Sequence, residues 1–120
     1  MNVGIALGAA REDKAEAVLR LALNELRSGN KVELFLVLNG VGLYELAERD
    51  PRISKLFDEA LSAGLDLTAC RACTAVHGAR RSVRCETTSI AYLFRLWRRS
   101  ERFFFVHRFR SAAGLTAGPK

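Results

Sequence analysis

The residues best suited to chemistry are two cysteines, Cys70 and Cys73, which form a C-x-x-C motif. The motif directly follows the apolar run Leu65 to Ala69, which has the composition of a buried strand, and a helix is expected to begin at the motif. Unpaired backbone N–H groups at a helix start favour the thiolate, the form that attacks sulfur or carbon. Arg71 and His77 lie close in sequence and act in the same direction. We therefore predict that Cys70 is the reactive thiol; a pair of small buried thiols is the structural alternative.

The third cysteine, Cys85, allows a different interpretation of the same segment. A Cys₃His zinc site needs four ligands, and sixteen residues supply them: Cys70, Cys73, His77 and Cys85. Structural zinc usually holds together small domains without a core, and this chain is long enough to build one, so we predict neither a metal nor another cofactor. Thioredoxin-like redox chemistry is also disfavoured, because the motif here follows the third predicted strand and not the first strand of a βαβ unit.

The elements that must position the thiols alternate between strand and helix patterns. Strands are predicted at residues 2–7, 31–38, 65–69 and 102–106. Helices are predicted at residues 11–27, 43–49, 51–64 and from Thr88 or Ser89 through Trp97. This alternation predicts an α/β three-layer sandwich, in which a mostly parallel sheet of four to five strands has helices on both faces. We expect a single domain over residues 1–110 and a flexible C-terminal tail over 111–120.

In a sheet of this kind, functional groups gather at the carboxyl ends of the strands. Three segments meet that description, at residues 8–11, 39–42 and 70–73. The second of them brings Asn39 and Gly40 toward the cysteine loop, where the Asn39 amide is a candidate supporting group. Turn chemistry alone also explains an Asn-Gly pair. The cysteine segment is therefore the one that carries the predicted chemistry.

The cysteine loop, residues 65–78, resembles that of the DsrE/DsrF-like proteins, especially their YchN-like branch. In that family a strand ends in C-x-x-C and a glycine follows eight residues after the first cysteine, as Gly78 follows Cys70 here. The opening strand, the turn at 37–41 and the Trp97-containing helix followed by residues 101–105 also match the family's outline. The resemblance covers roughly residues 1–106, and only the cysteine loop is specific.

The resemblance implies a function and an assembly. The cysteine that matches Cys70 carries sulfur as a persulfide between donor and acceptor proteins, and Cys73 either resolves or stabilises that persulfide. The subunits of the family assemble as trimers or hexamers. This sequence departs from the family between residues 79 and 87, where a usually apolar, acidic-leaning segment is replaced by one rich in arginine.

Composition limits the environment of the protein. The chain has 120 residues, of which 49% are hydrophobic, and its three cysteines are too few for a disulfide-stapled fold, so we expect a reducing, cytoplasmic location. No apolar run approaches the roughly 20 residues that span a bilayer. Met1 to Ala10 lacks the basic start of a secretion signal. No membrane association is therefore predicted.

The charge is concentrated at one end of the chain. Residues 78–120 carry 10 Lys and Arg against 2 Asp and Glu, a net +8, whereas residues 1–77 sum to −2. Arg80, Arg81 and Arg84 are expected at the rim of the cysteine crevice. The alternative function is an oligomeric binding module whose arginine-rich third docks an acidic protein or nucleic acid. Nucleic acid is disfavoured, because the spacing of Trp97 and of residues 103–105 favours burial of these rings.

Overall fold

Five parallel strands form the centre of the fold, in a computed structural model that describes residues 1–107 and 115–117. The strands are β1 (Asn2–Leu7), β2 (Lys31–Leu36), β3 (Asp66–Cys70), β4 (Glu86–Thr88), β5 (Arg102–Val106) and β6 (Leu115–Ala117). They lie in the order β4-β3-β2-β1-β5-β6, and β6 pairs antiparallel with β5. The helices are α1 (Glu12–Arg27), α2 (Leu43–Arg49), α3 (Pro51–Ser62), α4 (Arg71–Val76) and α5 (Tyr92–Arg99), with a 3₁₀ helix, η1, at Leu38–Gly42.

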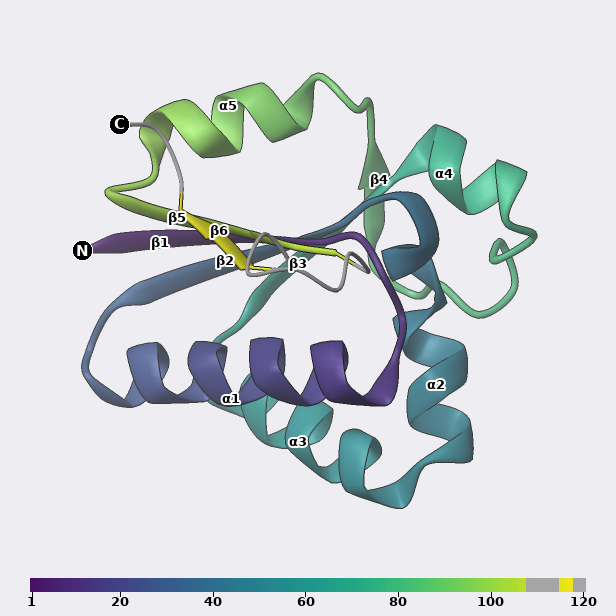
Figure 1. The fold of residues 1–120 in the computed structure, drawn as a ribbon, viewed down its shortest axis with the longest axis horizontal. Coiled ribbons are helices and arrows are strands. Elements are labelled where there is room, and N and C mark those ends of the chain that lie inside the picture. Colours follow the sequence, from purple (N-terminus) through teal and green to yellow (C-terminus); the bar gives the residue numbers. More distant parts are fainter. Residues whose placement is uncertain (108–114, 118–120) are drawn as a thin grey trace.

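Helices cover both faces of this sheet, which confirms the predicted three-layer α/β architecture. Figure 1 shows α1 and α3 below the sheet and α5 above it, with α2 and α4 at the carboxyl ends of the strands. On the lower face the apolar stripe of α1, including Val18 and Leu19, is buried against the side chains of β1, including Ile5. The period of 3.6 in α1 and of 2 in β1 produces this contact, because each pattern places its apolar residues on one side.

The predicted end of α1 and the predicted start of α3 are also confirmed. Gly29 adopts a φ of 89°, the left-handed conformation that ends α1 at little steric cost. The Asp50 carboxylate caps α3 by accepting hydrogen bonds from the backbone N–H groups of Arg52 (3.0 Å) and Ile53 (3.4 Å), and Pro51 occupies the first helical position.

Three features of the sheet differ from the sequence-based prediction. β2 ends at Leu36, two residues early, because Leu38 has a φ of 55° and turns the chain into η1. The polar stretch after the cysteine loop contributes the three-residue strand β4, which pairs with β3. Within the range predicted to be a tail, Leu115–Ala117 forms β6, and residues 111–114 and 118–120 lie outside the described residues.

A polar cluster holds α5 on the upper face. The Tyr92 hydroxyl donates to Glu33 of β2 at 2.6 Å, and the Arg99 guanidinium hydrogen-bonds both Glu33 and, at 2.7 Å, the Tyr92 oxygen. Leu96 is the fully buried residue of this helix, whereas Phe94 is 66% and Trp97 36% exposed. The expectation that the Trp97 ring is buried is therefore not met within the single subunit, because α5 turns Leu96 and not this ring toward the sheet.

Candidate functional site

Cys70 lies where β3 ends and α4 begins, at the carboxyl edge of the sheet, as the sequence predicts. Its sulfur accepts a hydrogen bond from the backbone N–H of Cys73 at 3.4 Å, so the thiol itself caps the helix. The side chain has 0% exposure and packs on the α5 face of the sheet with Phe35 and Leu96. The Cys70 sulfur is therefore held at the start of α4, yet it is closed off from solvent in the single subunit.

Cys73 lies one turn further along α4 and is half-buried between Cys70 and η1. Burial raises the pKa of the Cys73 thiol, and the hydrogen bond to the Cys70 sulfur raises it further, while the backbone N–H of Leu38 opposes both by donating to the Cys73 sulfur. The left-handed backbone of Leu38, unfavourable for leucine, lies directly beside this contact. The pair thus favours a proton on Cys73 that is directed at the Cys70 sulfur.

Thr74 is a supporting residue that the sequence analysis missed. Its hydroxyl donates to the Cys70 carbonyl at 2.8 Å, and the side chain is buried. A threonine four residues after a helix start commonly bonds back to the carbonyl at i−4, so the signal is present in the sequence. This bond ties the first turn of α4 to the end of β3, which fixes the backbone that carries Cys70.

Arg71 does not face the Cys70 sulfur, contrary to the expectation that it assists the thiolate. Its guanidinium donates to the Thr87 carbonyl at 3.2 Å and lines a pocket of about 350 Å³ together with Arg80. The other residues of this pocket show which side Arg71 faces: Val83 packs against the buried cluster on the face of the sheet opposite to Cys70, and Thr87 pairs with Ala69 of that cluster. Arg71 therefore links α4 to β4, and its positive charge lies on the face of the sheet opposite to Cys70.

His77 and Gly78 end α4 and do not enter the thiol pair. The His77 backbone N–H donates to the Cys73 carbonyl at 3.0 Å, while its side chain is exposed, with no hydrogen bond or ion pair to the described residues. Gly78 has a φ of 67°, and no heavy atom lies within 4 Å of the position that a Cβ would occupy. The glycine that carries the family resemblance thus has a local role, which is to terminate the helix.

Asn39 and Gly40 belong to η1, which packs against α4, so the structure does bring this segment to the cysteine edge. The Asn39 side chain makes no hydrogen bond among the described residues, and the backbone of Leu38 supplies the contact instead. Gly40 has a packing role: a Cβ there would lie 1.8 Å from the carbonyl oxygen of Leu7. The close approach of η1 to the end of β1 therefore requires glycine at this position.

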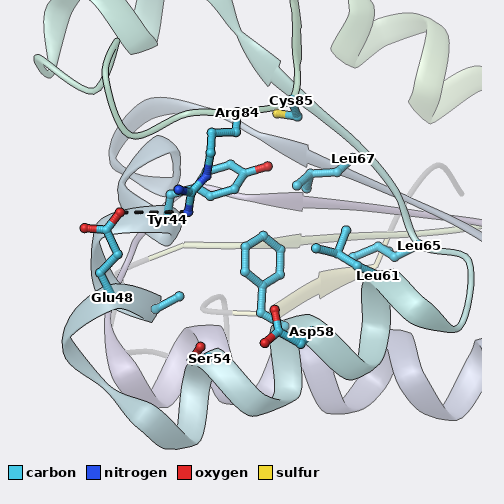
Figure 2. Close-up of a pocket in the computed structure, with 11 residues that line it drawn as sticks. Tyr44, Glu48, Ser54, Asp58, Leu61, Leu65, Leu67, Arg84 and Cys85 are labelled. Atoms are coloured by element: carbon cyan, nitrogen blue, oxygen red, sulfur yellow. Dashed lines mark ion pairs between the residues drawn. The ribbon is translucent and has the colours of Figure 1, made fainter.

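Cys85 lies apart from the other two thiols, in a separate pocket of about 580 Å³ beside Tyr44 (Figure 2). Burial raises the pKa of Cys85, and a hydrogen bond from the Tyr44 hydroxyl opposes that shift. Within residues 1–107 and 115–117, no three His, Cys, Asp or Glu side chains are grouped so as to hold a metal ion. The four residues of the Cys₃His alternative are thus not brought together.

The arginines after the cysteine loop separate instead of sharing one rim. Arg80 joins Arg71, whereas Arg84 pairs with Glu48 at 3.8 Å and lies over the Tyr44 ring at 5.2 Å. Arg81 is exposed on the loop between them. The predicted basic rim is therefore divided between two pockets, one lined by Arg80 and the other by Arg84.

Comparison with known proteins establishes the fold and leaves the activity open. No family model and no curated protein matches the sequence. Among solved structures, the chain is similar to a conserved protein of unknown function from Bacteroides thetaiotaomicron, with 18% identity, a TM-score of 0.72, and coverage of 88% of this chain and 94% of that one. Similarity at this identity shows a shared fold alone. A search of the described helices finds none with the length and apolar character needed to cross a membrane.

Proposed function

We propose that this protein is a sulfur carrier of the DsrE/DsrF-like type, in which Cys70 holds sulfur as a persulfide. The supporting observation is the Cys70 sulfur itself, which accepts the Cys73 N–H at 3.4 Å and faces the Cys73 thiol proton. Both donors stabilise negative charge on Cys70, and the thiolate is the form that attacks sulfur. The resemblance of residues 65–78 to the family's cysteine loop favours sulfur transfer over simple disulfide exchange.

The transfer balances without a cofactor. The Cys70 thiolate attacks the terminal sulfur of a donor persulfide, a new S–S bond forms on Cys70, and the donor leaves as a thiolate. An acceptor thiolate then takes the same terminal sulfur, and Cys70 leaves as a thiolate. In a side reaction, the Cys73 thiolate attacks the inner sulfur of the Cys70 persulfide, which closes a Cys70–Cys73 disulfide and releases hydrosulfide; the two cysteines are oxidised and the transferred sulfur is reduced.

The burial of Cys70 sets a requirement on this mechanism. At 0% exposure the sulfur cannot meet a donor until α4 moves, so we propose that α4 opens when a donor docks. Of the six residues of α4, only Thr74 is buried, and the helix lies at the end of the sheet (Figure 1). A segment with few buried contacts opens at low free-energy cost.

The partners proposed for this function are a donor protein, an acceptor protein and further copies of the chain. Exposed apolar side chains on α5 and beside it, namely Ile90, Phe94 and Trp97, provide a surface for assembly into a trimer or hexamer. The three cysteines are all free, which fits a reducing cytoplasm.

Peptide mass mapping tests the proposal, because trypsin cleavage after Arg71, Arg80 and Arg84 places the three cysteines on separate peptides. The reduced protein is treated with a polysulfide donor and mapped without reductant. We expect one added sulfur on the Cys70 peptide, none after Cys70→Ser, and an unchanged yield in the matched control Cys85→Ser. Cys73→Ser should prolong the persulfide, since the route to the disulfide is lost. Equal sulfur on all three cysteines, or an unchanged yield after Cys70→Ser, would contradict the assignment.

A second candidate function is supported by the exposed rings of α5. Phe94 and Trp97 lie edge-to-face with centroids 6.5 Å apart, and Arg95 and Arg98 of the same helix are also exposed. Exposed aromatic rings beside guanidinium groups suit an anionic partner such as single-stranded nucleic acid. Titration with an oligonucleotide should then quench the fluorescence of Trp97, the chain's one tryptophan, and the affinity should fall steeply with salt. Polyglutamate is the matched anionic competitor without bases.

A further inference from the structure

The pocket that contains Cys85 is a candidate binding site distinct from the thiol pair. It has a volume of about 580 Å³, within the range of small-molecule sites, and lies between α2, α3 and β3. These helices cover the face of the sheet opposite to the one on which Cys70 is buried. Neither Cys70 nor Cys73 lines the pocket, so its occupancy is independent of the proposed sulfur transfer.

The centre of the pocket is apolar and partly aromatic. The rings of Tyr44 and Phe57 meet edge-to-face at 5.2 Å, and Leu61, Leu65 and Leu67 continue the wall. Figure 2 shows Tyr44 above and Asp58 below, with Leu61, Leu65 and Leu67 to one side. Such a wall suits a ligand with a flat apolar body.

Charged groups lie around this centre, and they leave one negative charge uncompensated. Glu48 is paired with Arg84 at 3.8 Å, and the Arg84 guanidinium lies over the Tyr44 ring. Asp58 also lines the pocket and forms no ion pair with any described residue. The net charge of the pocket is therefore −1, which complements a ligand with a single positive charge.

We propose that this pocket binds a small aromatic amine, with its ring against Leu61 and Leu67 and its ammonium group toward Asp58. The Tyr44 hydroxyl and the Cys85 thiol supply further polar contacts at the upper end of the pocket (Figure 2). Occupancy by such a molecule covers Cys85 and leaves Cys73 as it is. The reactivity of the Cys85 thiol therefore reports whether the pocket is occupied.

Protection of Cys85 from N-ethylmaleimide measures the binding, with Cys73 in the same sample as the internal control. The probes are phenethylamine, the neutral 2-phenylethanol and the anionic phenylacetate, which share one ring and side-chain length. We expect phenethylamine to slow the labelling of Cys85 in a saturable manner, the alcohol to do so more weakly and the acid least. The labelling rate of Cys73 should stay constant. Equal protection by all three probes, or none by phenethylamine, would overturn the proposal.

Two variants separate the contribution of charge from that of the apolar wall. Asp58→Asn should weaken phenethylamine about two- to fivefold, the range for a partly exposed charge pair, and leave 2-phenylethanol unchanged. Asp66→Asn, an exposed carboxylate outside the pocket, is the matched control. Leu61→Ala, at a side chain that is 40% exposed and so removable without unfolding, should weaken both probes equally. Identical affinities for phenethylamine in Asp58→Asn and Asp66→Asn would exclude Asp58 as the ammonium partner.

Discussion

The two faces of the sheet are covered in different ways. On the lower face, α1 and α3 pack their apolar stripes against β1 and β2 in a continuous buried cluster. On the upper face, the described residues form a small buried cluster that consists of Ala6, Phe35, Val37, Cys70, Leu96 and Phe103. One helix, α5, lies over this cluster and is tied to β2 by a tyrosine, a glutamate and an arginine. The lower face supplies apolar packing, and the upper face holds the candidate chemistry under a thinner cover.

This difference assigns stability and function to separate parts of the molecule. Apolar burial on the lower face is non-directional and large, so it stabilises the sheet even when the elements at the edges of the sheet move. Hydrogen bonds such as those of Glu33 are smaller in net free energy and more specific in geometry. The upper face, where the proposed opening of α4 admits a partner protein to Cys70, is therefore held by a polar attachment and a small apolar cluster.

The largest expected effect lies on the lower face. Leu19→Ala removes a fully buried side chain of α1 and should lower the free energy of unfolding by about 3 kcal/mol, measured by urea denaturation. Leu61→Ala, on the outer side of α3, is the control and should cost less than about 1 kcal/mol. A cost of less than about 1 kcal/mol for Leu19→Ala would refute the view that this face dominates stability.

Glu33→Gln tests the polar attachment of α5 and should cost about 1 kcal/mol at neutral pH. Burial alone would raise the pKa of Glu33, but hydrogen bonds from Arg99 and Tyr92 and the positive charges of Arg99 and Lys31 outweigh it and hold the pKa below its ordinary value. A lowered carboxyl pKa stabilises the fold above the unfolded value of about 4.3 and loses this contribution as pH falls through the folded value. The difference between wild type and variant should therefore shrink in acid.

The control for this experiment is Glu86→Gln, an exposed carboxylate on β4 that forms no ion pair with a described residue. Urea unfolding curves at a series of pH values provide the comparison. A difference between wild type and Glu33→Gln that is constant from neutral to acidic pH would mean that the glutamate charge does not hold α5.

A smaller effect is expected within the thiol pair. Burial and the Cys70 sulfur raise the pKa of Cys73. The rate of its reaction with iodoacetamide should therefore increase at a higher pH than the rate for a free thiol. Cys70→Ser removes the neighbouring sulfur and should move the profile toward lower pH, whereas Cys85→Ser should leave it in place. An unchanged profile in Cys70→Ser would show that the two thiols do not share a proton.

The smallest change in stability is expected for Phe94→Ala, within about 0.5 kcal/mol, because the ring is largely exposed. The same change should lower the mass measured by light scattering if α5 forms the proposed interface between copies. Leu96→Ala, on the buried side of the same helix, should instead cost about 2 kcal/mol or more. Equal costs for the two variants would contradict the orientation of α5.

The sequence by itself determined the parts of the fold that depend on local patterning. The 3.6-residue period of α1, the left-handed glycine after it and the Asp-Pro start of α3 are local signals, and they agree with the predicted end of the first helix at residue 27 and the predicted start of the third at residue 51. The position of Cys70 at a strand end and helix start was predicted for the same reason. Each signal acts within one turn of the chain, so no knowledge of the remaining structure is required.

Only the tertiary structure decided where the side chains of the site point. Arg71 turns to β4, Cys85 lies in a pocket that Cys70 does not line, and the backbone of Leu38 reaches Cys73. These positions depend on the register of β3 with β4 and on the close approach of η1 to β1, which are contacts between segments distant in sequence. Arg71 is therefore separated from Cys70, its neighbour in sequence, by its bond to β4, whereas Leu38 is brought to Cys73 by the packing of η1 on α4.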